Sequence, residues 1–94
     1  MSKVKIGDKE YVVNYLNLAV TKKILKGKEE KKLDQLDFNS YILSEVINRC
    51  NPDAKLTFEK FDELVDIVEF ERIQDEIMEH SGLNKYFKAG IGKK

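Results

Sequence analysis

The sequence predicts a mainly helical α+β fold, in which an N-terminal β-hairpin is followed by about four short helices in a compact bundle. Two observations favour it: alternating apolar and polar residues flank Gly7-Asp8, and several later segments repeat apolar residues every three or four positions, the spacing of one helix face. The length of 94 residues suits one domain with a modest core.

The hairpin is predicted from its turn, since Gly followed by Asp is typical of a two-residue turn with a positive φ at the glycine. This turn pairs Ile6 with Lys9, Lys5 with Glu10 and Val4 with Tyr11. An isolated hairpin is only marginally stable in water, so the rest of the chain or another chain must cover its apolar face. That face carries Val4, Ile6, Tyr11, Val13 and Tyr15.

The first helix is expected to begin at Asn17, whose side chain can cap it, and to end near Lys26. Gly27 is a plausible stop. The polar residues that follow have no apolar periodicity, and the sequence leaves open whether residues 27–35 form a loop or a solvated extension of the helix.

The second helix is expected to start at Leu36 or Phe38 and to run to Cys50. Asn51-Pro52-Asp53 should end it, because proline cannot continue a helix and restricts the residue before it. Its buried stripe is predicted to contain Tyr41, Ile42, Leu43, Val46, Ile47 and Cys50.

The third helix is expected to begin at Thr57, a good N-cap, with Leu56 and Phe61 packed together as a hydrophobic staple. Its buried stripe is predicted to be Phe61, Leu64, Val65 and Val68.

Phe70, Ile73 and Ile77 do not continue this stripe, which predicts a break between Asp66 and Glu69. A fourth helix should then run from about Glu69 to His80, with Gly82 as its left-handed C-cap.

The predicted compact domain covers residues 1–82, and residues 83–94 form a basic tail that is expected to be partly mobile. The apolar cluster of the tail could close the core or dock onto a neighbouring chain. Together with part of the hairpin it gives the candidate partner-binding residues Tyr11, Val13, Tyr15, Leu83, Tyr86 and Phe87.

Charge is unevenly distributed although the formal net charge is zero. Residues 1–32 hold nine basic and four acidic residues (+5), residues 33–82 hold four and thirteen (−9), and residues 83–94 hold four and none (+4). Complementary patches of this kind suit self-association or the steering of a protein partner. The alternative is a solvated helix surface between basic ends.

No constellation for catalysis, cofactor binding or metal binding can be assembled from the sequence. The lone Cys50 and His80 fall on different predicted helices and cannot make a closed zinc site without carboxylate ligands. The many carboxylates of residues 59–79 spread around a helix face, as expected for a solvated surface. We therefore expect no catalytic residue, no cofactor, no metal and no enzymatic activity.

The compartment predicted from the sequence is the reducing cytoplasm. One cysteine allows no internal disulfide, the start of the chain does not resemble a signal peptide, and no apolar run reaches membrane-spanning length. Lys85 and Lys88 flank two aromatic residues, a weak nucleic-acid signal. The zero net charge and the acidic middle of the chain speak against such binding.

The order of elements and several short motifs resemble the tail assembly chaperones of long-tailed bacteriophages and prophages. The resemblance covers Val4 to about Gly82 and rests on Lys9-Glu10-Tyr11 in the hairpin, on Asn51-Pro52, and on Leu56-Thr57-Phe58-Glu59 at a helix start.

This resemblance implies a non-enzymatic protein of the bacterial host cytoplasm that binds the tape measure protein and helps to gather tail tube protein. It also implies self-association, and the G/A-rich codons expected for Gly92-Lys93-Lys94 are compatible with a programmed frameshift. The alternative is a small cytosolic adaptor or regulatory domain, linked to nucleic acid through its basic tail.

Overall fold

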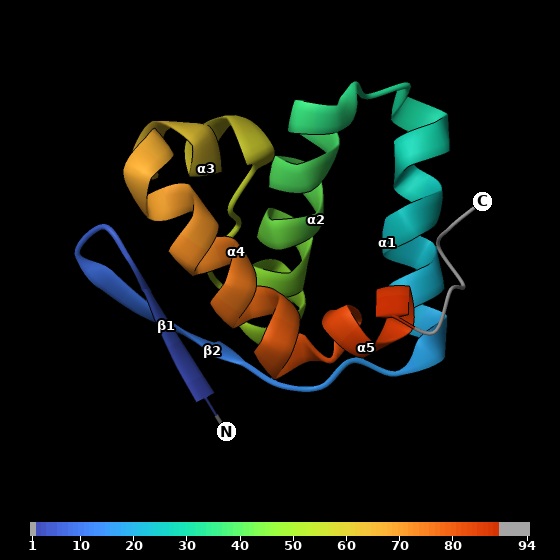
Figure 1. Ribbon diagram of the computed structural model, residues 1–94, viewed down its shortest axis with the longest axis horizontal. Coiled ribbons are helices and arrows are strands. Elements are labelled where there is room, and N and C mark those ends of the chain that lie inside the picture. The colour runs from blue at the N-terminus through green and yellow to red at the C-terminus, as the bar shows by residue number, and fades with distance from the viewer. Residues whose placement is uncertain (1, 89–94) are drawn as a thin grey trace.

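The computed structural model describes residues 2–88, without the side chains of residues 28 and 86–88. It confirms a mainly helical α+β fold in which a two-stranded antiparallel hairpin precedes the helices (Figure 1). The strands are β1 (Ser2–Ile6) and β2 (Lys9–Val13). The helices are α1 (Leu18–Lys31), α2 (Gln35–Cys50), α3 (Phe58–Leu64), α4 (Ile67–Ser81) and α5 (Leu83–Lys88).

The predicted hairpin register is confirmed, with Val4 opposite Tyr11 and Ile6 opposite Lys9. Gly7 adopts φ +62°, which a residue without a side chain reaches at little cost. The hairpin lies alongside α4 in Figure 1, and β2 also contacts α2. The rest of the chain therefore covers the part of the predicted face that lies in the strands, where Val4, Ile6 and Val13 are buried. Tyr15 lies beyond the end of β2 and is 76% exposed, so its place on the covered face was predicted wrongly.

The Asn51 side chain closes the outer edge of β2. Its Oδ1 accepts a hydrogen bond from the Val12 N–H at 3.0 Å, and its Nδ2 donates to the Val12 carbonyl at 2.8 Å. One amide side chain thus makes both bonds that a neighbouring strand would make. On the β1 side, Arg72 of α4 donates to the Lys5 carbonyl at 3.3 Å.

The core lies between the hairpin and the helices, with α2 at the centre of the molecule (Figure 1). Phe61 of α3 is fully buried and meets Phe70 of α4 edge to face, with ring centroids 6.4 Å apart. The predicted staple is consistent with this packing, since Leu56 is also buried. The largest fully buried side chains are Phe61, Ile6, Ile24, Leu43, Ile47, Ile73, Ile77 and Leu83.

The prediction that Gly27 ends the first helix is wrong. Asn17 caps α1 as expected, its Oδ1 accepting from the Val20 N–H at 2.9 Å, but the helix continues to Lys31. Gly27 is buried inside it, and a Cβ there would lie 2.7 Å from Cζ of Tyr41. This glycine serves close packing of α1 on α2, and the chain leaves the helix at Lys32 with φ +54°.

The second helix agrees with the prediction, ending at Cys50 before Asn51, and it begins at Gln35 behind the N-cap Asp34. The third helix begins after Thr57 as predicted, with the Lys60 N–H bound to Thr57 Oγ1 at 3.1 Å. It is shorter than its apolar pattern indicated, because α3 ends at Leu64.

The predicted stripe of the third helix is therefore wrong at two of its four positions. Leu64 is 45% exposed and Val68 is 80% exposed, while Phe61 is buried and Val65 partly buried. The predicted break exists, but α4 begins at Ile67 and not at Glu69, because Asp66 caps it. Gly82 is its left-handed C-cap with φ +84°, as predicted.

The chain packs beyond residue 82, the predicted end of the domain. Residues 83–88 form α5, and Leu83 is buried in the core. Residues 89–94 of the predicted tail lie outside the described residues. Within residues 2–88, no helix is both long and apolar enough to cross a membrane.

Candidate protein-binding groove

Four of the six large apolar side chains that are exposed on the described surface belong to the start of α2 and to the region where α3 passes into α4: Leu36, Leu64, Ile67 and Val68. Ile67 is 87% exposed, Val68 80% and Leu36 73%. Single exposed apolar residues are ordinary, but neighbours of this size form a patch.

Leu36 and Ile67 line one groove of about 300 Å³, which we call the acidic groove. Its walls come from the start of α2 and from the corner between α3 and α4. The lining residues are Leu36, Asp37, Ser40, Asp62, Val65, Asp66, Ile67 and Phe70.

Two helix starts explain why the groove is acidic and apolar together. Asp34 Oδ1 accepts from the Asp37 N–H at 2.9 Å to cap α2, and Asp66 Oδ1 accepts from the Glu69 N–H at 2.7 Å to cap α4. Carboxylates are favoured at such positions because they bind free N–H groups and face the positive end of the helix dipole. Leu36 and Ile67 lie in the first turns of these helices and project past the core.

A hydrogen bond between α2 and α3 joins the walls. Ser40 Oγ donates to Asp62 Oδ1 at 2.5 Å, which holds this carboxylate at the groove. Ser40 is buried, and Val65 and Phe70 are partly buried behind it. The groove therefore has an apolar floor that is continuous with the core.

Several carboxylates lie close to Asp37, and every influence on the pKa of its carboxyl acts in the same direction. Burial raises the pKa of the Asp37 carboxyl, and the neighbouring carboxylates of Asp34, Asp62 and Glu59 raise this pKa further. Its charged form is thus disfavoured by both of the ordinary causes, desolvation and like charge. None of the eight lining residues is basic.

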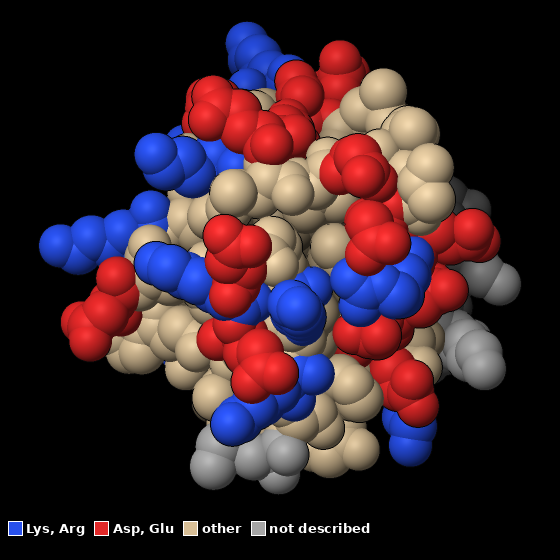
Figure 2. Space-filling model, turned by 90° about the vertical axis from the view of Figure 1, so that its left-hand side faces the viewer, with Lys and Arg blue, Asp and Glu red and all other residues tan. Residues whose placement is uncertain are grey.

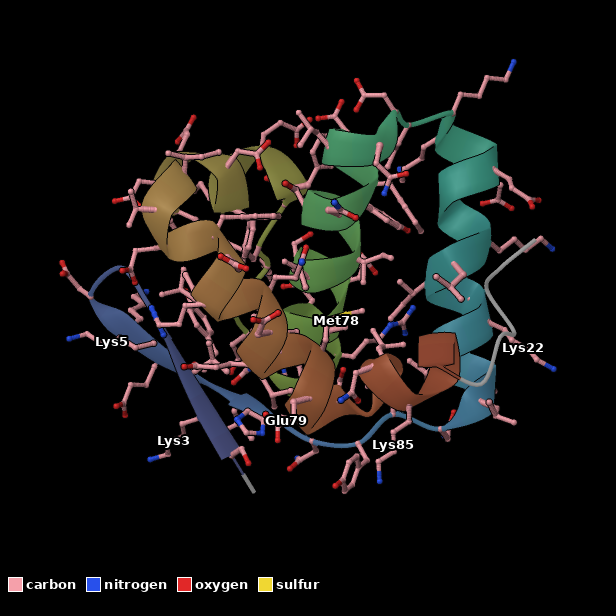
Figure 3. The ribbon with its side chains drawn as sticks, viewed as in Figure 1. Lys3, Lys5, Lys22, Met78, Glu79 and Lys85 are labelled. Carbon is pink, nitrogen blue, oxygen red and sulfur yellow. The ribbon has the colours of Figure 1, made fainter. Side chains whose placement is uncertain are left out.

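The surface around this corner has mixed charge elsewhere. Figure 2 views the side of the hairpin, α3 and α4, where acidic and basic side chains are interleaved over most of the face and uncharged atoms lie among acidic side chains at the upper right. Arg72 contributes to the interleaving through ion pairs with Glu69 and Glu76 of α4. Lys3, Lys5, Lys22 and Lys85 extend away from the helices and strands that carry them (Figure 3).

The structure does not bring the candidate residues predicted from the sequence into one surface. Val13 and Leu83 are buried in the core, so Leu83 closes the core, one of the two alternatives left open. Tyr11 is partly buried against it. Tyr15 is largely exposed and lies beside Gly82, where a Cβ would be 3.1 Å from Tyr15 Cδ1. The side chains of Tyr86 and Phe87 lie outside the described ones.

Sequence reasoning missed Leu36 and Ile67 and placed Val68 in the core. The signals that could have found them are two N-cap patterns: Asp34 followed by Asp37, which starts a helix at Gln35, and Asp66 followed by Glu69, which starts a helix at Ile67. With that start, Ile67 and Val68 occupy the first turn and precede the buried Ile73 and Ile77.

A second hollow, of about 260 Å³, lies between α2 and α4. Gln35, Asn39 and Gln74 give it amide groups, and Met78 of α4 (Figure 3) contributes to its apolar part. Its lining carries no formal charge and none of the largely exposed apolar residues, so we consider the acidic groove the better candidate site.

Cys50 is a partly buried thiol, and its Sγ accepts a hydrogen bond from the Asn14 N–H at 3.4 Å, directly after the end of β2. Among residues 2–88, no group of three or more His, Cys, Asp or Glu side chains is placed to hold a metal ion.

Comparisons of the chain with protein-family models, with curated proteins and with solved structures gave no match.

Proposed function

We propose that this protein is a non-enzymatic tail assembly chaperone of a long-tailed phage or prophage, which acts in the host cytoplasm. In this role it binds the tape measure protein and assists assembly of the tail tube. The acidic groove with its exposed rim is the observation that supports the proposal most, because it is a surface that a protein partner could cover. The order of hairpin and helices agrees with the resemblance.

The physical reason for such a helper lies in its partner. A long helical protein that waits for assembly exposes apolar stripes along its length, and these stripes favour aggregation. A small domain with an apolar groove can cover one section of a stripe by the helix-in-groove mode of recognition. Many copies would then protect the whole length until tube subunits replace them.

Co-expression tests the proposal directly. The gene should lie near one for a very long protein rich in helical repeats, and the two products should be expressed together with a tag on the small one. We expect the long protein to co-purify and to stay in solution only with its helper. A long protein that is equally soluble alone, and does not co-purify, would contradict the proposal.

Self-association is part of the proposed function, since the helper acts in many copies. Sedimentation velocity over a hundredfold range of protein concentration measures it. We expect the sedimentation coefficient to rise with concentration, and a constant value for one protomer would refute this part alone.

A further inference from the structure

We propose that the acidic groove binds an α-helical segment that inserts a large apolar side chain between Leu36 and Ile67 and carries lysine or arginine beside it. This inference rests on the proposed function in taking the partner to be a protein, and it adds the chemistry by which the partner is selected.

The apolar part of the argument is the exposed rim. Leu36 and Ile67 line the same groove from α2 and from α4, and both are largely exposed. Covering such side chains is favourable by about 25 cal/mol for each Å² of apolar surface removed from water. A side chain seated between them would also contact the apolar floor formed by Val65 and Phe70.

The charge of the groove selects basic neighbours for that apolar side chain. Five carboxylates surround the site, those of Asp34, Asp37, Glu59, Asp62 and Asp66. The dipoles of α2 and α4 oppose them with only about half a positive charge each. The charge that lines the groove is therefore negative, and like charge on a partner would add to the repulsion that these carboxylates already exert on one another.

The partner's backbone must be internally hydrogen bonded, which favours a helix over an extended segment. The lining residues belong to α2, α3, α4 and the short link between the last two, so the groove presents no strand edge with which an extended peptide could pair. A helix satisfies its own N–H and C=O groups and needs only side-chain contacts.

Two synthetic helical peptides provide the test: both carry the same leucine stripe, and its flanking positions are lysine in one and glutamate in the other. Fluorescence anisotropy measures binding to the full chain at low and at high salt. We expect the lysine peptide to bind at least tenfold more tightly than the glutamate peptide, with the advantage shrinking as salt screens the charges. Equal binding of the two peptides overturns the inference.

Variants then locate the binding. Ile67→Ser should weaken the lysine peptide about tenfold or more, because it removes most of the apolar rim on one side. Leu18→Ser is the matched control, since Leu18 is an exposed apolar residue of α1 outside the groove. An equal loss in both variants would place the peptide elsewhere and overturn the inference.

A second pair of variants tests how much the charge of the groove contributes to binding. Asp37→Asn should weaken the lysine peptide about two- to fivefold at low salt, the range of an exposed ion pair. Glu79→Gln, an exposed acidic position near the far end of α4, should leave binding unchanged. If the two substitutions weaken binding alike, the selection is not made by the groove.

Failure of this inference is distinguishable from failure of the proposed function. If the tape measure protein co-purifies equally well with Ile67→Ser, the groove is not the contact and the proposed function stands. If the lysine peptide binds at the groove but no tape measure protein co-purifies, the inference stands alone. If deleting residues 89–94 strengthens peptide binding, the chain's own tail is the occupant and the inference is wrong.

Discussion

Gly27 determines how closely α1 can approach α2. Tyr41 fills the space that a Cβ would need, and Lys31 of α1 lies over the same ring, its Nζ 6.0 Å from the centroid. A glycine inside a helix costs about 1 kcal/mol relative to alanine, so the close approach offsets an intrinsic weakness of α1.

Gly27→Ala is expected to destabilise the protein by about 1–3 kcal/mol, because Tyr41 must move. In a Tyr41→Ala background the same substitution should instead stabilise it by up to about 1 kcal/mol, since helix propensity then dominates. Urea unfolding of the four proteins in the cycle measures both effects. Destabilisation of equal size in the two backgrounds would show that the ring is not the cause.

Asp37→Asn should change how stability depends on pH. The pKa of Asp37 is raised in the folded protein above its ordinary value of 3.8, so its favourable contribution is complete below that value. It is lost as pH rises through the raised pKa. Unfolding at pH 3 and pH 7 should therefore show the variant gaining stability relative to the wild type at pH 7. A relative loss at pH 7 would contradict the crowding of carboxylates at the groove.

At the scale of elements, the Asn51 side chain makes hydrogen bonds that a third strand would otherwise make. Its amide group bonds both backbone groups of Val12 and also donates to the Ile47 carbonyl at 2.8 Å. The hairpin is thereby attached to the end of α2. The sequence predicted Asn51 only as part of the segment that ends this helix.

Asn51→Ala should cost about 1–3 kcal/mol, the penalty for leaving partly buried backbone groups without partners. Hydrogen exchange measured residue by residue should show the Val12 amide losing protection. The Tyr11 amide faces β1 in the paired register and is the internal control, which should keep its protection in the variant. If Val12 stays protected, its partner is not the Asn51 side chain.

The position of α3 is tested by two residues three positions apart. Phe61→Ala should cost about 3–5 kcal/mol because the ring is fully buried against Phe70. Leu64→Ala should cost less than about 1 kcal/mol because nearly half of that side chain is exposed. Thermal unfolding of both variants decides between this structure and one continuous buried stripe, for which the two losses would be similar.

At the scale of the whole molecule, local signals in the sequence predicted most of the fold. The turn at Gly7, the caps at Asn17 and Thr57, the stop after Cys50 and the left-handed Gly82 each have a local physical cause. These signals were sufficient because hairpin registers and helix ends depend mainly on neighbours in the chain.

The predictions that were wrong depend on contacts between distant residues. From the sequence alone, Gly27 indicates the end of a helix. In the fold it lies inside α1, because the Tyr41 ring occupies the space that a Cβ would need. The apolar spacing predicts that Val68 is buried. Because a new helix begins after Asp66, Val68 is exposed instead. The groove combines residues from two helix starts, and periodicity within either helix gives no information about such an arrangement.

The corner that holds Leu36 and Ile67 joins positions 31 residues apart in the chain. The unfolded polypeptide does not keep them together, so a ligand seated there would bind only the native conformation. Occupancy and conformational stability would then be linked by mass action: at a hundred times its dissociation constant, such a ligand adds about 2.7 kcal/mol. For a chain of this size, that gain would lengthen the lifetime of the protein against proteolysis for as long as its partner is present.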